Sequence, residues 1–380
     1  MAAVVLARGK DQRIKAGHLW VYASEIASVD EGAAPGDVVE VRDFRRRLLG
    51  RGTYNPASTL AVRIFTRHAD EAVDRGLFER RIEEALAYRS RLFPAETTLR
   101  LIFSEGDHLP GLVVDRYGGF LCLQEVLAVL KERLEPAGIY ERSDLSSRVR
   151  EGLPPAEGIL LGSVPEAIPV ILDGLEFRVR LSEGQKTGFY LDQRLNRREI
   201  VPLSEGKRVL DAFCNTGGFG LYALKGGAAS VVGVDISATS VLRATEQAAL
   251  NGFAGRCEFR QANAFDFLHE LDRSGEKFDL VVLDPPAFTK SARSVPQAWR
   301  GYKEINLRAL RVLSPGGFLF TASCSFHLGA EDFLAMLREA AADSRRRVRL
   351  VALRGQSPDH PMLSGVPETR YLKFAILHCS

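Results

Sequence analysis

The sequence predicts an α/β protein whose C-terminal half is a mostly parallel sheet covered by helices on both faces, preceded by two smaller domains. Three observations lead to this prediction. From about residue 182 onward, buried-strand patterns alternate with amphipathic helix patterns. A glycine-rich turn joins the first of these strands to a helix, and an acidic residue ends the next strand. Before residue 182 this alternation is absent, and short strands separated by turn residues dominate.

Residues 1–68 are predicted to form a small, strand-rich, basic domain. They hold 11 Lys/Arg and 7 Asp/Glu, which gives +4, whereas the whole chain carries +3. A basic loop at 42–47 contains one aromatic residue, Phe44. Such a domain suits contact with RNA phosphates and bases, with Arg45, Arg46 and Arg47 as the predicted contacts; a solvated hairpin tip is the alternative. The expected strands are 4–8, 38–41, 48–54 and 59–66, and a helix is expected at 13–26.

Residues 69–181 are predicted to form a central α+β domain. A helix is expected from Asp70 to Phe93, where Pro94 disfavours helical angles at the preceding residue. A three-stranded meander should follow, because apolar runs there are separated by glycine-rich turns. The expected elements are strands at 99–103, 111–115, 120–124, 159–161, 170–172 and 175–181 and a second helix at 126–134.

Residues 182–380 carry the alternating pattern of a doubly wound sheet, whose ligands are expected at the carboxyl ends of the strands. The last two strands are separated by a loop without a full helix, which predicts an antiparallel hairpin at one edge of the sheet. Strands are expected at 209–213, 230–235, 257–262, 278–284, 317–323, 347–353 and 372–378, and helices at 219–225, 238–251, 265–273, 299–313 and 331–342.

Composition places the chain among ordinary soluble proteins. Of its 380 residues, 46% are hydrophobic and 26% charged, and it shows neither a signal-peptide pattern nor an apolar run long enough to span a membrane. Its five cysteines are scattered and never form a CxxC pair. This pattern predicts reduced thiols in the cytoplasm and no zinc or other metal site.

The turn after Asp211 is the strongest local signal for a cofactor. Backbone N–H groups at a glycine-rich helix start can approach a ligand, and Asp235, which ends the next strand, can accept ribose hydroxyls. Phe213 and Asn215 occupy positions where the dinucleotide fingerprint GxGxxG requires glycine, and no P-loop lysine follows. The turn therefore predicts a nucleoside-containing cofactor that is neither a nicotinamide dinucleotide nor a nucleoside triphosphate.

Three further motifs point to chemistry at the same edge of the sheet. The fourth strand ends in Asp284-Pro285-Pro286, and the fifth ends in the run 321–325, which contains Cys324. If these strands are neighbours, Cys324 lies beside Asp284. The third motif, 184–194, precedes the first strand and is expected to fold over the far end of the cofactor.

On these motifs, together with residues 17–22 near the N-terminus, the chain resembles the large-subunit ribosomal RNA cytosine-5 methyltransferases that carry an N-terminal PUA domain. The resemblance covers essentially the whole chain. It implies a PUA domain at 1–68, a central domain at 69–181 and a class I methyltransferase domain with a Rossmann-like, mostly parallel seven-stranded sheet at 182–380. It also implies S-adenosylmethionine as cofactor and large-subunit (23S) ribosomal RNA as partner, with no membrane; a homodimer stays open.

The resemblance also implies roles for individual residues. Cys324 would attack C6 of a cytosine, so that C5 becomes nucleophilic enough to take the methyl group, and Asp284 would hold the base. Pro286 stands where related enzymes can carry a second cysteine, which implies a single-cysteine cycle. Asn263 stands in place of a common aspartate, and Lys290 is expected to touch RNA phosphate. The cofactor-binding residues so implied are Phe189, Gln193, Arg194, Asp211, Phe213, Asn215, Thr216, Gly217, Gly218, Asp235, Ile236, Asn263, Ala264, Asp284 and Pro285.

Two other functions remain open at this stage. Asp-Pro-Pro also resembles the motif of enzymes that methylate the exocyclic amine of guanine, and those enzymes need no cysteine nucleophile. A non-catalytic RNA-binding ribosome assembly factor that keeps the fold is the third reading. The first alternative predicts full turnover after Cys324→Ala, and the second predicts no binding of S-adenosylmethionine.

Overall fold

The computed structural model describes residues 1–124, 130, 133–143, 148–149, 151–182, 188–289 and 291–380. The chain divides into two compact units. The first comprises Met1–Val170, Val179–Leu191 and Pro358–Thr369, and the second comprises Ile171–Arg178, Asp192–Ser357 and Arg370–Ser380. The predicted helix at 126–134 lies mostly outside the described residues. None of the helices in the described ranges is both long and apolar enough to cross a bilayer.

The N-terminal part of the first unit is a six-stranded sheet in the order β2-β6-β5-β4-β1-β3. Only the β1–β4 pair is parallel. Apolar side chains from alternate strand positions, together with Ile14, form its core. The elements are β1 (Ala3–Leu6), α1 (Gln12–Lys15), β2 (Trp20–Tyr22), β3 (Ile26–Val29), β4 (Val38–Arg42), β5 (Leu48–Tyr54) and β6 (Leu60–Thr66).

The predicted helix at 13–26 is wrong. A single helical turn, α1, ends before Gly17, whose φ of 107° lies outside the helical region. The residues that follow, Trp20–Tyr22, are β-branched or aromatic and pair with β6. The strand preference of Trp20–Tyr22, together with their pairing to β6, outweighs the helical spacing of the apolar residues between positions 13 and 26.

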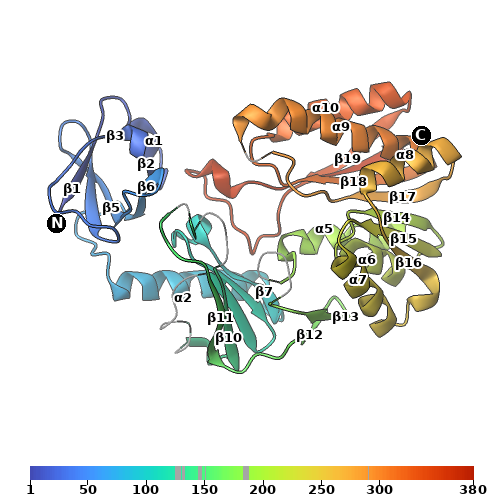
Figure 1. The fold of residues 1–380 in the computed structure, drawn as a ribbon, viewed down its shortest axis with the longest axis horizontal. Coiled ribbons are helices and arrows are strands. Elements are labelled where there is room, and N and C mark those ends of the chain that lie inside the picture. The colour runs from blue at the N-terminus through green and yellow to red at the C-terminus, as the bar shows by residue number, and fades with distance from the viewer. Residues whose placement is uncertain (125–129, 131–132, 144–147, 150, 183–187, 290) are drawn as a thin grey trace. The chain divides into compact units, whose positions relative to one another are not determined.

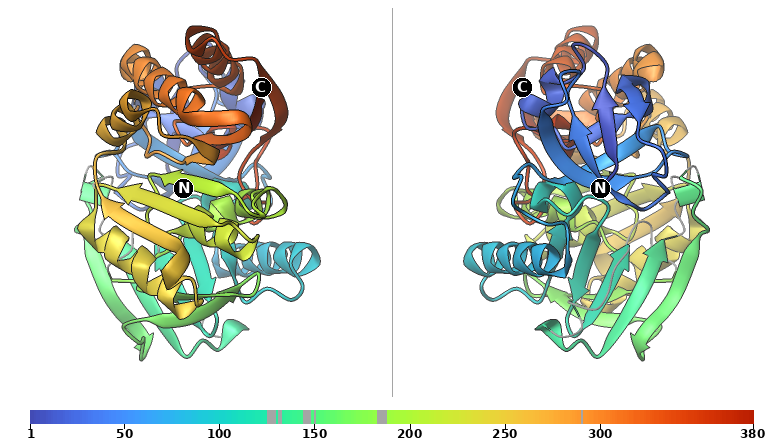
Figure 2. Two further views of the ribbon diagram at one scale, coloured as in Figure 1. Left: turned by 90° about the vertical axis from the view of Figure 1, so that its right-hand side faces the viewer. Right: turned by 90° about the vertical axis from the view of Figure 1, so that its left-hand side faces the viewer.

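The rest of the first unit is a five-stranded sheet in the order β11-β10-β9-β8-β7, with α2 packed beside the edge strand β7 (Figure 2). Asp74 caps α2 by accepting a hydrogen bond from Leu77 N–H, so the helix starts later than predicted. Strand β10 has no counterpart among the predicted strands. The elements are α2 (Arg75–Leu92), β7 (Thr98–Phe103), η2 (Ser104–Asp107), β8 (Val113–Tyr117), β9 (Phe120–Gln124), β10 (Gly138–Ser143) and β11 (Ala156–Gly162). The hairpin of β12 (Ile168–Leu172) and β13 (Leu175–Val179) follows in the chain, and most of it belongs to the second unit.

The second unit is a seven-stranded sheet in the order β16-β15-β14-β17-β18-β20-β19, which confirms the predicted α/β class. The first five strands of this order are parallel, and β20 is antiparallel to both of its neighbours. Helices α6 and α7 lie on one face and α8, α9 and α10 on the other (Figure 1). The strands are β14 (Arg208–Ala212), β15 (Ser230–Asp235), β16 (Cys257–Gln261), β17 (Phe278–Leu283), β18 (Leu313–Ser323), β19 (Val348–Arg354) and β20 (Lys373–Cys379).

Helices α6 to α10 follow the predicted pattern within a few residues, whereas the short helix α5 has no counterpart among the predicted helices. The predicted antiparallel pair of closing strands is confirmed, with β20 in the interior beside β18 and β19 at the edge. Between these two strands the chain leaves the second unit and contributes Pro358–Thr369 to the first. The helices are α5 (Arg194–Arg198), α6 (Gly218–Lys225), α7 (Ala238–Leu250), α8 (Ala264–Ser274), α9 (Val295–Val312) and α10 (Ala330–Ser344).

Candidate cofactor and catalytic site

The carboxyl ends of the five parallel strands gather the predicted site residues of the second unit at one edge of the sheet. Because these strands run in the same direction, the residues that end them lie at the same edge. In spatial order the strand ends carry Asn263, Asp235, Asp211, Asp284 and Cys324.

The turn between β14 and α6 is held in an uncommon backbone conformation. Phe213, Asn215 and Gly217 have φ values of 65°, 47° and 82°. A Cβ atom on Gly217 would lie 3.1 Å from that of Ala244, so this position also has little room for a side chain. Non-glycine residues with positive φ are strained and cluster at ligand sites. Hydrogen bonds hold this conformation: Cys214 N–H donates to the Val234 carbonyl, Asn215 N–H to the Asp235 carboxylate and Gly217 N–H to the Cys214 carbonyl.

Asp211 is a buried acid with a raised pKa at this edge. Its side chain is 1% exposed, its Oδ2 accepts a hydrogen bond from Gly220 N–H at 2.8 Å, and within the described residues its Oδ1 has no partner. Burial raises the pKa of Asp211 to about 7, and the charges of Asp284 and Asp235 add to this effect. A cationic ligand group would satisfy the buried oxygen and favour the ionised carboxylate.

Asp235 organises the adjoining loop. Its Oδ2 accepts a hydrogen bond from Asn215 N–H and its Oδ1 accepts one from Ser237 N–H, both at 2.9 Å. Each oxygen keeps a lone pair for a ribose hydroxyl. The neighbouring Ile236 is 70% exposed, an apolar surface beside the predicted ribose position. Asn263 caps α8 by accepting a hydrogen bond from Phe265 N–H at 2.9 Å, so its side-chain oxygen already has a structural task.

Asp284 is positioned by a chain of amides from the segment before β14. Gln193 Nε2 donates to Asp284 Oδ1 at 2.9 Å, and Asn196 Nδ2 donates to Gln193 Oε1 at 2.7 Å. Gln193 and Asn196 are each 2% exposed, so this chain is shielded from water. Gln193, predicted to bind the cofactor, therefore contacts the carboxylate predicted to hold the base.

Cys324 lies where the sequence places it, next to the Asp-Pro-Pro loop. Strands β17 and β18 are parallel neighbours, with Leu283 opposite Thr321, and Cys324 Sγ is 3.9 Å from the Pro285 carbonyl oxygen. Its side chain is half-buried. Cys214, in contrast, is buried, and burial raises its pKa well above the ordinary value, as expected of an inert structural thiol.

For the remaining predicted site residues, the structure gives a position or a burial but little about a role in the site. Phe189 belongs to the first unit, where its N–H donates to the Tyr117 hydroxyl at 3.1 Å. Arg194 is 2% exposed, and Ala264 and Pro285 are also buried. Residues 184–187 of the predicted loop and Lys290 lie outside the described residues. Thr216 is half-buried in the turn and Gly218 begins α6.

The arginine loop predicted to bind RNA is a tight turn between β4 and β5. The buried Asp43 accepts hydrogen bonds from Arg45 N–H and Arg47 N–H, both at 2.9 Å, and forms an ion pair with Arg47 at 2.7 Å. Arg46 has a positive φ of 61°. The Arg45 guanidinium stacks 5.2 Å from the ring centroid of Phe44, which is 41% exposed. The loop thus presents a cation and an aromatic ring on an ordered backbone.

Sequence reasoning missed Lys373, the first residue of β20. It is 4% exposed and lies opposite Ser323 in the register of β18 and β20, one residue from Cys324. Burial lowers its pKa to about 8. The available signal was a single lysine at the second position of the largely apolar predicted strand 372–378.

These groups fit S-adenosylmethionine. The unpartnered Asp211 Oδ1 suits the cationic amino group of its methionine part, Asp235 suits the ribose, and the exposed Ile236 suits the adenine. For each of these three parts of the cofactor, the chain has a residue of a suitable type.

Comparison with known proteins identifies the family. Residues 145–373 match the S-adenosylmethionine-dependent methyltransferase family, and residues 4–67 match the PUA-like domain. Curated relatives named ribosomal RNA large subunit methyltransferase I include one from Shewanella denitrificans, 40% identical over 387 residues and 97% of each chain, and one from Photobacterium profundum, 39% identical over 388 residues and 98% of each chain.

Among solved structures, a putative S-adenosylmethionine-dependent methyltransferase from Streptococcus mutans has the same fold, with a TM-score of 0.83 at 19% identity over all of both chains. The family match extends over more than half of the sequence, and the curated relatives align along nearly its whole length. The chain belongs to the S-adenosylmethionine-dependent methyltransferases and, among them, to the family of ribosomal RNA large subunit methyltransferase I.

Proposed function

We propose that this protein methylates C5 of a cytosine in large-subunit (23S) ribosomal RNA, with Cys324 as nucleophile. The observation that carries the proposal is the half-buried Cys324 beside the Asp284-Pro285 loop, at the carboxyl edge of the sheet. The relatives that align along the whole chain are named for the same class of RNA, which supports ribosomal RNA as the substrate.

The proposed reaction follows from the weak nucleophilicity of C5. The Cys324 thiol loses its proton, and the thiolate forms a C–S bond at C6 while the C5–C6 double bond opens, so that C5 gains enamine character. S-adenosylmethionine supplies the methyl group as an electrophile. C5 then loses its proton to a base, the C5–C6 double bond re-forms, and the C–S bond breaks to return the thiolate. Asp284, held by Gln193, binds the pyrimidine at N3 or its exocyclic amine during the attack.

Cofactor binding is assigned to the residues around the β14–α6 turn. Asp211 would hold the amino group and Asp235 the ribose hydroxyls, while Asn215, Thr216, Gly217 and Gly218 would approach through their backbone. The other cofactor contacts proposed from the sequence are Phe189, Gln193, Arg194, Phe213, Ile236, Asn263, Ala264, Asp284 and Pro285.

RNA binding is assigned first to the PUA-like domain. We propose a division into residues 1–68 for RNA binding, 69–181 as a central domain and 182–380 for catalysis, in a cytoplasmic protein. The ordered loop with Arg45, Arg46 and Arg47 beside the exposed Phe44 supports phosphate contact combined with base stacking. Lys290 and self-association into a homodimer remain predictions; sedimentation of the purified protein tests the latter.

The decisive test is base-resolved mass mapping of large-subunit RNA after incubation with the cofactor and either the wild-type protein or Cys324→Ala. Wild-type protein should form 5-methylcytosine and the variant should not. Cys257→Ala is the matched control, because Cys257 begins β16 at the opposite edge of the sheet. Full turnover by Cys324→Ala would instead favour methylation of a guanine amine. Failure of the wild-type protein to bind S-adenosylmethionine in calorimetry would favour a non-catalytic assembly factor.

A further inference from the structure

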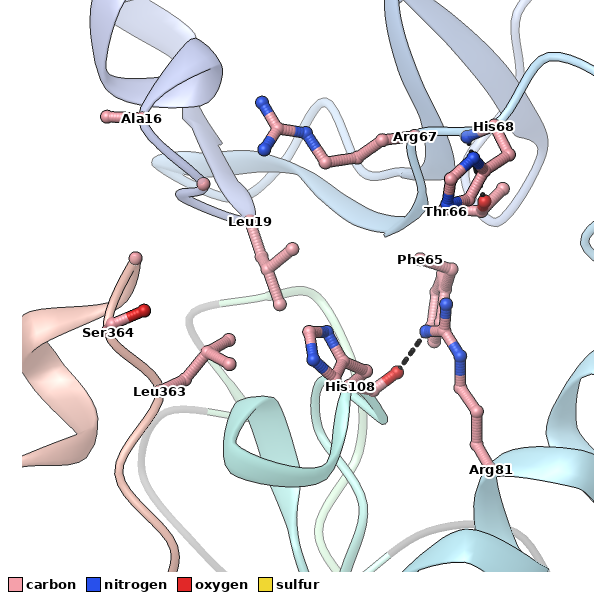
Figure 3. A pocket seen from close by; sticks show the side chains of 12 residues that line it. Ala16, Leu19, Phe65, Thr66, Arg67, His68, Arg81, His108, Leu363 and Ser364 are labelled. Carbon is pink, nitrogen blue, oxygen red and sulfur yellow. Dashed lines mark hydrogen bonds between the residues drawn. The ribbon is translucent and has the colours of Figure 1, made fainter.

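A basic cleft in the first unit has no role in the function proposed above. It has a volume of about 260 Å³, just below the roughly 300–1,000 Å³ typical of small-ligand pockets. Five segments converge on it: the α1–β2 loop, the end of β6, helix α2, the residue after η2, and part of the segment Pro358–Thr369 (Figure 3). Its lining residues are Ala16, Gly17, Leu19, Phe65, Thr66, Arg67, His68, Arg81, His108, Leu363, Ser364 and Gly365.

The charge of the cleft suits an anion. Its lining includes Arg67 and Arg81 and no carboxylate. Arg81 donates one hydrogen bond to the His108 carbonyl (Figure 3), and Arg67 donates one to the Ile14 carbonyl. A guanidinium has five N–H donors, so each arginine is anchored by these bonds and keeps donors for a phosphate. The Glu71 carboxylate lies 4.0 Å from Arg81 and is not part of the lining.

The apolar part of the lining suits a base or a sugar. The half-buried Leu363 is its accessible apolar side chain, whereas Leu19 and Phe65 also line the cleft but are only 2% and 7% exposed. A site for a phosphate ion alone needs no such surface, whereas a nucleotide has both an anionic and an apolar part. The exposed Ser364 provides a hydroxyl of the kind that a nucleotide uses.

The walls of the cleft are fixed before any ligand arrives. A Cβ atom on Gly365 would lie 2.6 Å from the Gly17 carbonyl oxygen, so the two backbones touch directly. The buried His18 contacts Glu368 at 3.1 Å, and Trp20 Nε1 donates to Glu105 Oε1 at 2.9 Å. A site that needs little rearrangement loses less free energy to ordering when it binds.

We propose that this cleft, the Arg67–Arg81 cleft, binds one unpaired nucleotide of the RNA substrate, with Arg67 and Arg81 on its flanking phosphates. The proposal rests on the proposed function and adds to it a second RNA contact, separate from the arginine loop of the PUA-like domain. Unpaired nucleotides are the part of an RNA that can enter a pocket, because their bases are free to leave the stack.

The test is fluorescence anisotropy of a labelled large-subunit RNA transcript with Arg67→Gln, Arg81→Gln and the double variant. Glutamine keeps a donor for the anchoring carbonyl and removes the charge. At about 0.1 M salt, each substitution should weaken binding about fivefold to tenfold and lower the slope of log K against log salt by about 0.7–0.9. The matched control is Arg91→Gln, which changes an exposed arginine on α2, the helix that carries Arg81. This variant should keep the wild-type affinity for RNA.

The proposal for the cleft would be overturned if the double variant kept the wild-type RNA affinity and the wild-type slope of log K against log salt. A loss of RNA affinity that does not depend on salt would also overturn it. Thermal melting and calorimetry with S-adenosylmethionine check that the variants remain folded. If the wild-type protein neither binds nor methylates the transcript, the proposed function fails instead, so the two failures are distinguishable.

A second, independent observation concerns Lys373. Its Nζ donates to the carbonyl oxygens of Ser325 at 2.6 Å and Tyr371 at 2.8 Å. Both acceptors are neutral, so these bonds hold the ammonium group without cancelling its charge. Lys373 interacts electrostatically with Cys324 and with the cationic Arg370. Tyr302 on α9 also interacts with this thiol, and burial raises the pKa of Tyr302, so its hydroxyl stays neutral.

We infer that Lys373 is a positioning residue that stabilises the thiolate of Cys324 and holds the Ser323–Ser325 turn. The inference deepens the proposed function. A cation beside a thiol favours the charged, nucleophilic form, and the hydrogen bond to Ser325 fixes the backbone next to the nucleophile. At neutral pH most of the lysine is protonated, since its pKa is about 8.

The test is alkylation of Cys324 by iodoacetamide across a pH series, read by peptide mass mapping without RNA or cofactor. Lys373→Met should raise the midpoint of alkylation by about one pH unit and slow the reaction about tenfold near neutral pH. Lys373→Arg should retain the wild-type midpoint. Lys277→Met, at the opposite edge of the sheet just before β17, is the matched control.

A wild-type midpoint in Lys373→Met would overturn the inference. If melting shows that the methionine variant does not fold, Lys373→Gln replaces it, since glutamine keeps a donor and lacks the charge. Because the assay uses no RNA and no turnover, its result is independent of whether the proposed substrate is correct.

Discussion

The buried Asp211 predicts that cofactor affinity depends on pH. Its pKa of about 7 means that much of the ligand-free protein holds a neutral carboxyl near neutral pH. A cofactor with a cationic amino group requires the ionised form. Asp211 must therefore lose a proton when the cofactor binds, and the free energy of that loss is subtracted from the affinity.

The size of the effect follows from the ionised fraction. About 3% of Asp211 is ionised near pH 5.5 and about half near pH 7, so affinity should rise about 15-fold between them, or about 1.6 kcal/mol. The amino group of the cofactor stays protonated over this window, because α-amino groups titrate at roughly 7.7–8.0. Binding near pH 7 should release about half a proton.

Isothermal titration calorimetry with S-adenosylmethionine, in buffers of different ionisation enthalpy, measures both quantities. Asp211→Asn should bind more weakly, and its affinity should not change over the same pH window. A flat affinity in the wild-type protein would refute the reasoning. The same pH dependence in Asp211→Asn would show that another group titrates.

Three further predictions follow from described contacts. In the ligand-free protein the raised pKa of Asp211 favours the folded state with a protonated carboxyl. The stability that this carboxyl contributes is present below about pH 4 and is lost as the pH rises through about 7. Above pH 7, Asp211→Asn should therefore unfold at a higher denaturant concentration than the wild-type protein, with an unfolding free energy larger by on the order of 2–4 kcal/mol. Asp235→Ala removes the acceptor of two backbone N–H groups and the proposed acceptor of the ribose hydroxyls, so calorimetry should show about a 100-fold loss of cofactor affinity that Asp332→Ala on α10 does not reproduce. Gly365→Ala should lower the unfolding free energy by about 1–3 kcal/mol in urea titrations, because its Cβ would meet the Gly17 backbone, whereas Gly355→Ala, with 3.6 Å to its nearest neighbour, should be tolerated; equal effects of the two would contradict the close approach.

The catalytic half of the fold could be predicted from sequence because its signals are local. The central strands β14 and β17 are buried on both faces and read as apolar runs, and the residues near their carboxyl ends stand at the ligand edge. Asp211, Asp235, Asp284 and Cys324 were placed from this rule alone, and the family predicted from their motifs is confirmed.

The parts that sequence did not predict depend on contacts between distant segments. The helix expected at 13–26 fails because Trp20–Tyr22 pair with β6, some forty residues away. Lys373 gains its relevance only from the register that sets it opposite Ser323. Likewise, the Arg67–Arg81 cleft requires Gly365 to touch Gly17, and no local pattern in either segment predicts that approach.

The position of β20 has a consequence for how the enzyme is made. β20 lies between β18 and β19 although it follows both in the chain, so a growing chain makes both of its neighbours first. Until β20 emerges from the ribosome, the sheet has a gap one strand wide next to β18, the strand that leads to Cys324. A nascent chain can therefore complete its N-terminal sheet before the seven-stranded sheet can close. That sheet is completed in one late step, when β20 pairs with both neighbours and places Lys373 opposite Ser323.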